Sequence, residues 1–429
     1  MNYIRQIIYE MRHQKMMTWV SICGTALAIF LVMTFFMTDQ VKTVEVAPET
    51  HRQKIYIGQN IHISGGEWGD SSGSMHYDAA RSVYDNLESV EIASFMSQWS
   101  DNADINVRGG EAISSLPKRV DENFWKIYDF RFVSGHPFDK ADCDSDAKKA
   151  VLSRSLARRL FGEDDVAGRE VMVNMMPYTV VGVVEDVSPL LSTTYAGFYL
   201  VFTRDYGMSG NEKWFGNTQV ALLLKDGVSP DRLRQEVKGR YATLGAQVAK
   251  EGAELIYHEQ PYDAETVAEG GYGSNNTPDM KSKHVLSYFL YGIMILLPAI
   301  NLSSMTRSRL RHRVSEIGVR RAFGARRISI LVQMLGENFV ITIIGGVIGL
   351  VLSVVFILLA SNLFFLYSGS MSSSSLDVVN ARPSFDMLFT WSNFFVALAL
   401  CFILNLISAT VPAWQASRVE PAVAIAKVK

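Results

Sequence analysis

Hydrophobic and polar positions divide the chain into four apolar runs near its ends and one long polar block between them. The first run, Met17 to Thr38, contains no charged residue, and as a helix it would span the roughly 30 Å of a bilayer's hydrocarbon core. The other three runs are also long enough to cross and lie at about His284–Met305, Leu335–Leu366 and Met387–Val411. The pattern predicts four transmembrane helices and argues against a single soluble enzyme domain.

The first run has one alternative interpretation, a cleaved signal peptide. Arg5, Arg12 and Lys15 precede it, as basic residues precede such a peptide. The apolar region of a signal peptide would be shorter, however, and no A-x-A-like site follows Phe36. We therefore expect a retained helix.

Charge is distributed unevenly between these parts. The whole chain carries 41 Lys+Arg and 43 Asp+Glu, a net charge of -2. Residues 39–283 hold 26 of the basic and 37 of the acidic residues, a net of about -11, whereas the rest of the chain is at about +9. The near-neutral total therefore comes from an acidic central block and basic flanks.

The short loops predict the orientation, because loops rich in Lys and Arg stay cytoplasmic. Arg307 to Arg327 carries eight Arg and one Glu, while the loop between the third and fourth runs carries only Arg382. Both termini and the Arg-rich loop are therefore expected inside, and the acidic block outside. The predicted segments are a cytoplasmic amphipathic N-terminus at 1–16, transmembrane helices at 17–38, 284–306, 335–366 and 387–411, an external domain at 39–283, a cytoplasmic loop at 307–334, an external loop at 367–386 and a cytoplasmic tail at 412–429.

The external block alternates short β-rich and helical stretches, which predicts an α+β domain of two lobes. Asp121 and Ser153 are expected to cap two of its helices. A hairpin is expected around Pro177. A strand, a helix and a strand near its end are expected to form a parallel pair with a crossover helix. The predicted strands are Lys54–Ile63, Val90–Gln98, Ala150–Leu152, Val171–Met175, Thr179–Val184, Thr218–Leu224 and Glu254–His258, and the predicted helices are Tyr77–Leu87, Asn123–Tyr128, Arg154–Leu160 and Pro230–Leu244.

The external block offers little catalytic chemistry. Its five histidines lack metal-ligand spacing. The run Asp139–Asp146 lacks the Gly and terminal Glu of a calcium loop and is better explained as a solvated acidic turn. There is no G-x-S-x-G, and Cys143 is the only cysteine of the block. We expect no catalytic residue, metal or cofactor in this chain.

The Arg-rich loop contains a short predicted helix. Ser315 is placed to cap it, Glu316 lies in its first turn, and Gly324 ends it. Two interpretations stay open: an interfacial element held by anionic membrane lipid, or a docking helix for a cytoplasmic partner.

At this point the sequence resembles a known family. EIGVRRAFGA, from residue 316, followed by an apolar helix with a Gly-Gly pair, is similar to the signature of FtsX-like permeases of ABC transporters. RVDENFWKIYDFRFVSGHPFDKAD and AVLSRSLARRLFGEDDVAGREVMVNMMPYTVVGVVEDV resemble the periplasmic core domain of MacB-type transporters, and PAWQASRVEPAVAIA resembles the family's tail.

The resemblance implies a mechanotransmission permease of the cell inner membrane. Two permease copies, or this chain and a paralogue, would form a dimer, and ATP with Mg²⁺ would bind to a separate ABC ATPase. No G-x-x-x-x-G-K-[ST] occurs in the sequence. A periplasmic adaptor or outer-membrane channel is a further partner that the family allows, and no nucleic acid is expected. The motif positions implied to couple to the ATPase are Glu316, Ile317, Gly318, Arg320, Arg321, Gly324 and Ala325.

Small residues on the third apolar run are candidates for helix packing. Gly345 and Gly349 form a G-x-x-x-G, with Gly346 beside them, and such spacing allows two helices to approach closely. The sequence leaves open whether the partner helix belongs to the same chain or to a second copy.

Export or mobilisation of an envelope substrate is the function that these patterns favour, with efflux as one form of it. Two alternatives are a membrane signalling protein that controls an envelope enzyme, and a permease that releases lipoproteins. A stand-alone enzyme is the weakest option, because the external block shows no catalytic constellation.

Overall fold

The computed structural model divides the chain into two compact units. The helical unit comprises Met1–Gln40, Lys281–Ala360 and Leu388–Lys429, and the mixed unit comprises Val41–Met280 and Ser361–Met387. The residues that the structure describes are 15–40, 44–188, 191–204, 213–269, 279–293, 296, 323, 327–367 and 390–418.

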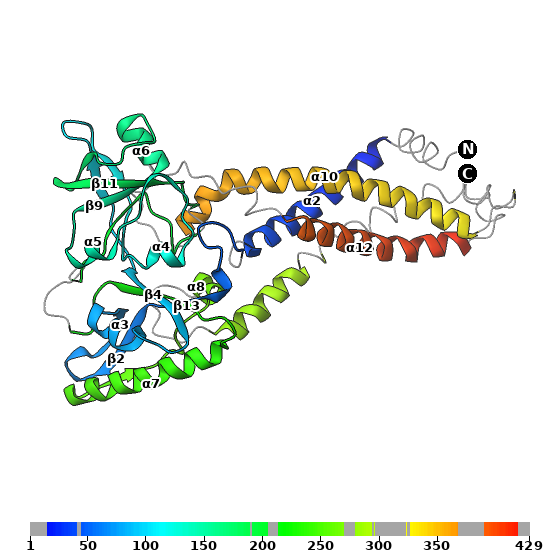
Figure 1. Cartoon of the computed structure of the whole chain (residues 1–429). Coiled ribbons are helices and arrows are strands. Elements are labelled where there is room, and N and C mark those ends of the chain that lie inside the picture. The colour runs from blue at the N-terminus through cyan, green and yellow to red at the C-terminus, as the bar shows by residue number, and fades with distance from the viewer. Residues whose placement is uncertain are drawn as a thin grey trace. The chain divides into compact units, whose positions relative to one another are not determined.

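The helical unit contains long helices that lie side by side (Figure 1). They are α2 (Lys15–Gln40), α10 (Arg327–Tyr367, in this unit up to Ala360) and α12 (Trp391–Arg418), and a further helix covers residues 280–293. At 1.5 Å per residue, α2 is about 39 Å long. Within the described residues, Thr18–Met37 and Phe339–Ile357 are long and apolar enough to span a bilayer, and Trp391–Leu400 is a shorter apolar stretch.

A large sheet forms the framework of the mixed unit (Figure 1). Most neighbouring strands are antiparallel, but β9 pairs with β11, and β7 with β12, in parallel. Its strands, in spatial order, are β1 (Ile55–Gly58), β13 (Thr218–Leu224), β4 (Val90–Ser97), β7 (Pro117–Val120), β12 (Phe198–Val201), β9 (Lys149–Ser153), β11 (Met176–Val184), β10 (Glu170–Val173), β5 (Ala103–Asn106) and β6 (Ile113–Ser115), with β8 (Phe132–Gly135) against β11.

A second, three-stranded sheet and short helices complete this unit. The sheet has the order β14 (Ala253–Ile256), β2 (Asn60–Gly65) and β3 (Asp70–Ser74). The helices are α3 (Tyr77–Tyr84), α4 (Phe124–Ile127), α5 (Lys140–Asp144), α6 (Arg154–Phe161), α7 (Pro230–Val248) and α8 (Ala264–Glu269), with 3-10 turns at Arg52–Lys54, Gly66–Trp68 and Ala249–Glu251.

Local sequence explains where several of these elements begin and end. Ser229 caps α7 by accepting a hydrogen bond from Arg232 N, and Pro230 occupies the first helical turn. Gly162 ends α6 in the left-handed conformation, with φ of 79°. The predicted helix at Tyr77–Leu87 and strand at Val90–Gln98 are confirmed as α3 and β4.

Apolar side chains bury the two faces of the large sheet. One cluster joins α3 and α7 to strands of both sheets, with Tyr84 and Val237 fully buried. A second packs α4 against the sheet around Phe124, and a third packs α6 around Leu156. The mixed unit therefore has the core that its length allows, built without a disulfide among its described residues.

The predicted parallel pair of Thr218–Leu224 and Glu254–His258 is wrong. The first strand, β13, already has β1 on one edge and β4 on the other, so neither edge can accept another strand. The second strand, β14, pairs antiparallel with β2 in the small sheet.

The predicted single strand Lys54–Ile63 is also wrong, because the strand is interrupted at Gln59. Gln59 N donates to Gln260 Oε1 over 2.8 Å instead of joining a ladder. The residues before the break form β1 in the large sheet, and those after it form β2 in the small one.

The hairpin of Val171–Val184 is confirmed, but its turn lies earlier than expected. Asn174 and Met175 both have positive φ, 47° and 66°, which fits a two-residue hairpin turn. Pro177 therefore lies within β11, opposite Met172.

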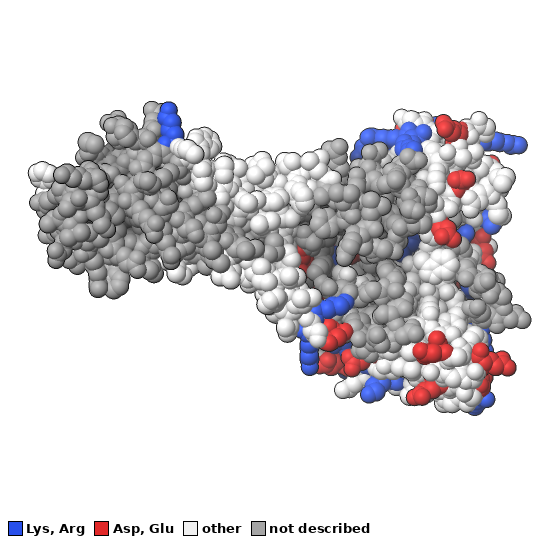
Figure 2. Space-filling model, turned by 180° about the vertical axis from the view of Figure 1, so that it is seen from behind, with Lys and Arg blue, Asp and Glu red and all other residues white. Residues whose placement is uncertain are grey.

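Charged side chains follow the division into two units. In Figure 2 the described surface of α2, α10 and α12 is almost free of Lys, Arg, Asp and Glu, whereas the mixed unit carries both signs over its surface. An uncharged helix surface is what contact with hydrocarbon requires.

Candidate functional site

The expected coupling residues, 316–318, 320–321 and 324–325, lie outside the described residues. One neighbour, Phe323, is described and is 88% exposed. An exposed aromatic ring within a basic segment is the kind of side chain that anchors protein contacts. Phe323 is not among the predicted coupling residues, although its position inside the signature, between Arg321 and Gly324, was a usable signal.

Gly345 and Gly349 of α10 face α2, and at both positions the two helices approach closely. A Cβ built on Gly345 would lie 2.8 Å from Thr25 Cβ, and one built on Gly349 would lie 2.6 Å from the carbonyl oxygen of Ala26. Real Cβ atoms do not approach other atoms so closely. The G-x-x-x-G is thus used for packing within the chain.

The third glycine brings α12 into the same contact. A Cβ on Gly346 would lie 2.7 Å from Leu398 Cδ1 and 3.4 Å from Ile29 Cδ1. Phe339 and Phe402 meet edge to face with ring centroids 5.3 Å apart, an arrangement that aromatic quadrupoles favour. The three helices therefore interlock around the small residues of α10.

Polar side chains join the helices at the C-terminal end of α2. Tyr291 OH donates to Asp39 Oδ2 over 2.8 Å, and Asn393 Nδ2 donates to Gln40 Oε1 over 2.6 Å. Gln40 Nε2 also donates to the hydroxyl of Thr390. These contacts connect α2 to the helix at 280–293 and to α12. Sequence reasoning missed them, since they join residues about 250 to 350 positions apart.

The chain that follows α2 enters the mixed unit through a buried charged cluster. Glu49, 3% exposed, accepts a hydrogen bond from Thr194 Oγ1 over 2.8 Å and pairs with Arg52 Nε at 3.3 Å. A cavity of about 20 Å³ beside them is also lined by Tyr128 and by residues of α8. The site thus joins residues from the beginning, middle and end of the segment Val41–Met280.

Burial dominates the electrostatics of this cluster. Desolvation raises the pKa of Glu49 above its ordinary value, although Arg52, Thr194 and Lys118 oppose the rise. Desolvation likewise lowers the pKa of Lys118 to about 8, against the attraction of Glu49. A buried charge of this kind is costly to leave without its partner.

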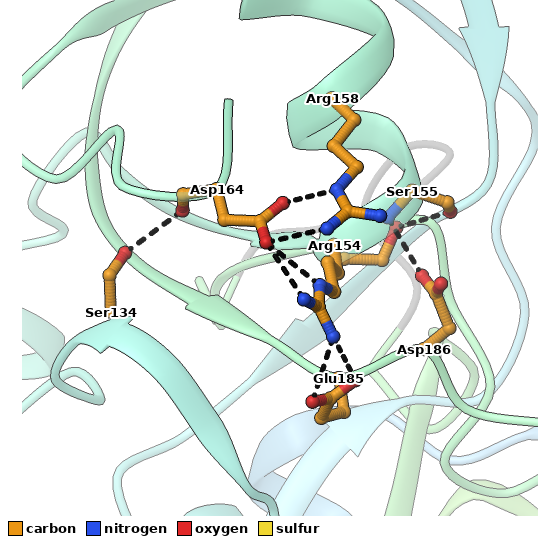
Figure 3. A network of polar contacts seen from close by, with 8 residues as sticks. Ser134, Arg154, Ser155, Arg158, Asp164, Glu185 and Asp186 are labelled. Carbon is orange, nitrogen blue, oxygen red and sulfur yellow. Dashed lines mark hydrogen bonds and ion pairs between the residues drawn. The ribbon is translucent and has the colours of Figure 1, made fainter. Parts of the chain in front are cut away.

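A second polar network fixes α6 to the rest of the mixed unit (Figure 3). Arg154 Nε and Arg158 Nη2 each donate to Asp164 Oδ2 over 2.9 Å, and Arg154 Nη1 reaches Glu185 Oε1 at 3.2 Å. The hydrogen bond from Arg158, followed by those from Arg154, holds the pKa of Asp164 below its ordinary value.

The helix cap in this network differs from the prediction. Ser153 is the N-cap residue of α6, but its side chain makes no cap hydrogen bond. Asp186 Oδ1 instead accepts from Ser155 N over 3.0 Å, as Figure 3 shows. At α4 the N-cap residue is Asn123 and not the predicted Asp121. Asp121 Oδ1 nevertheless accepts from Phe124 N, the first residue of the helix, over 3.0 Å.

The acidic run at Asp139–Asp146 is mostly exposed, as expected of a solvated segment, but Lys140–Asp144 within it forms the short helix α5 and not a turn. Asp139 and Asp142 form a capping box at the start of α5, and the Asp142 carboxylate pairs with Lys149. Among the described residues, no three His, Cys, Asp or Glu side chains gather into a metal site.

Two family profiles match the chain. The MacB-like periplasmic core domain matches residues 18–240, more than half of the chain, and the FtsX-like permease C-terminal domain matches residues 288–421. The second match spans the predicted coupling residues as well as α10 and α12.

Individual relatives are distant. The chain is 22% identical over 306 residues to YknZ of Bacillus subtilis, described as an uncharacterized ABC transporter permease, which covers 70% of this chain and 67% of that protein. It is 22% identical over 427 residues to the macrolide export ATP-binding/permease protein MacB of Haemophilus ducreyi, which covers 97% of this chain. The chain spans 55%, little more than half, of that protein's length.

Among solved structures, the periplasmic region of MacB from Actinobacillus actinomycetemcomitans is 14% identical and covers 50% of this chain and 91% of that one, with a TM-score of 0.36. The profile matches, by their extent, show the family. This chain belongs to the ABC transporter permeases that combine a MacB-like periplasmic core domain with an FtsX-like permease domain in the inner membrane.

Proposed function

We propose that the chain is the permease subunit of a mechanotransmission ABC transporter. A separate cytoplasmic ATPase hydrolyses ATP, and the resulting movement reaches the periplasmic domain, where it exports or mobilises an envelope substrate. In this proposal the chain crosses the membrane four times, with both termini inside and a two-lobed domain outside, and it acts as a dimer.

The observation that carries the proposal is the packing of α10 on α2. α10 begins at Arg327, where the Arg-rich loop ends, and runs without interruption for 41 residues. Because Gly345 and Gly349 have no side chain, α10 packs closely against α2 at these two positions. A displacement of the loop end of α10 would then move α2 with it, because close-packed helices transmit strain instead of absorbing it.

From α2 the movement has a covalent route into the mixed unit. The chain continues from Gln40 to the Glu49–Arg52 cluster, where Thr194 Oγ1 and the guanidinium group hold the Glu49 carboxylate. The hydrogen bond to Thr194 ties the entering segment to a distant part of the mixed unit. We propose that it serves as the attachment through which α2 acts on the domain.

The partner ATPase is proposed to bind the loop around Glu316–Ala325. Arg320 and Arg321 supply positive charge, and the exposed ring of Phe323 supplies an apolar anchor. Interfaces depend on a few such aromatic and Arg side chains.

Co-purification tests this proposal. The full chain, expressed with the ABC ATPases of its host, is expected to retain one ATPase on an affinity column. Arg320→Glu with Arg321→Glu, and separately Phe323→Ala, should lower the retained ATPase at least about tenfold, the loss expected when an interface anchor is removed. Arg204→Glu, in the mixed unit, is the matched control. If the loop variants retain as much ATPase as the control, the coupling assignment is wrong.

A further inference from the structure

Three titratable side chains lie in a row across the small sheet. His62 Nε2 of β2 is 2.7 Å from Asp70 Oδ1 of β3, and His62 Nδ1 is 2.7 Å from Nε2 of His258, two residues after β14. His62 is 5% exposed, whereas the Asp70 side chain is 65% exposed. Both nitrogens of the buried imidazole are therefore engaged.

The two imidazole rings lie end to end. Their planes differ by 5° and their centroids are 5.0 Å apart. Since each nitrogen lies on the perimeter of its ring, so large a centroid separation beside an N···N distance of 2.7 Å requires the two nitrogens to point at each other. This geometry fits one N–H···N hydrogen bond. It does not fit a shared Zn²⁺, whose tetrahedral bonds of about 2.0–2.1 Å would hold the nitrogens well beyond 2.7 Å apart.

The His62–His258 pair joins the segment that follows β14 to strand β2. Ile256 of β14 lies opposite His62 in the ladder, and the chain then passes through His258, whose carbonyl oxygen accepts from Tyr262 OH over 2.6 Å. Residues 257–262 lead into α8 and on toward the helix at 280–293. The His62–His258 bond is thus one of the contacts that hold this exit segment to β2.

We infer that His62, His258 and Asp70 form a proton-operated latch that holds the end of β14 on β2 and opens when both imidazoles become charged. In the neutral pair, His62 donates to Asp70 and accepts from His258. One added proton is tolerated, because charged His62 donates to both neighbours while His258 changes tautomer and accepts. A second proton leaves two N–H groups facing each other, which breaks the bond.

Nearby carboxylates favour charged imidazoles, whereas burial of the pair opposes a second charge. Glu254 of β14 lies on the same face of the sheet as His62. Next to the pair, burial and then Glu259 raise the pKa of Tyr257, and Arg234, on α7, lowers it. Burial, and then the charge of His62, lower the pKa of His258. A folded pKa below the unfolded one means that the open segment binds more protons as the pH falls. The latch is therefore stable above about pH 6.5 and weakens below that value.

Hydrogen exchange of the full chain in lipid nanodiscs tests this latch, which does not depend on the proposed ATPase coupling. Exchange of residues 253–262 is followed from pH 7.5 to pH 5.0 and corrected for the intrinsic pH dependence of amide exchange. For wild type we expect the opening equilibrium to rise about tenfold per pH unit for each extra proton bound on opening. His258→Gln should remove this rise, and His136→Gln, an exposed histidine of the same unit, should keep it.

Asp70→Asn gives the second readout. It keeps an oxygen acceptor for His62 Nε2 but removes the charge that stabilises the singly protonated pair. The closed segment then holds fewer protons, so opening should start at higher pH and depend on pH more steeply. A pH-independent opening in wild type, an unchanged rise in His258→Gln, or a shift of Asp70→Asn to lower pH would each overturn the inference.

Discussion

Carboxylates in the mixed unit are held by more than one partner, whether they are buried, as Glu49 is, or partly exposed, as Asp164 is. Glu49 has Thr194 and Arg52, and Asp164 has Arg154 and Arg158. At Glu49, loss of Arg52 would remove an ionic partner from a buried carboxylate, which is costly. Such side chains position the segments that carry them, so their substitution is expected to change local order before it changes the fold.

The cap of α6 provides a residue-scale prediction. Asp186→Ala should lower the stability of α6 by about 0.5–2 kcal/mol, because Ser155 N loses its acceptor. Ser153→Ala is the matched control and should be close to neutral, since the Ser153 side chain makes no cap bond. Hydrogen exchange of residues 154–161 measures both variants, and an equal or larger effect of Ser153→Ala would contradict this assignment of the cap.

At the scale of elements, the small residues of α10 decide how the helices pack. Gly349→Ala places a methyl group 2.6 Å from the backbone oxygen of Ala26, so α2 must move away. Overpacking of this kind costs about 1–3 kcal/mol. Thermal unfolding of the full chain in detergent should show a lower midpoint for this variant.

The matched control for that prediction is Gly292→Ala. Gly292 also lies in a helix of the same unit, and a Cβ there meets no atom within 4 Å. We expect its midpoint to stay near that of wild type, since Ala also favours a helix. Equal midpoints for the two variants would mean that α2 and α10 do not meet at Gly349.

Local sequence signals predicted individual elements well. The helix at Tyr77–Tyr84 follows from periodicity, and the hydrogen bond from Phe124 N to Asp121 at the start of α4 joins residues close in sequence. Both depend on contacts within a few residues, which a single sequence displays directly.

Pairing over long distances was not predictable in this way. The break at Gln59 depends on Gln260, about 200 residues away, and the placement of β14 depends on which edges of β13 are already occupied. The His62–His258 contact and the polar contacts of Asp39 have the same origin. Spacing along the chain contains no signal for such partners.

At the scale of the whole molecule, the chain combines an acidic central domain with basic flanking segments and nearly uncharged helices. The family match assigns this combination to a permease with a periplasmic domain. What distinguishes the proposed mechanism from a static membrane anchor is that nucleotide turnover on one side must change the domain on the other.

Hydrogen exchange of the assembled complex tests that claim most directly. The full chain with its co-purified ATPase is placed in nanodiscs, and residues 44–57 and 253–269 are compared without nucleotide and with ATP plus vanadate. We expect nucleotide to change the protection of these segments, and Gly349→Ala to weaken the change. Vigorous ATP hydrolysis that leaves both segments unchanged would contradict the account.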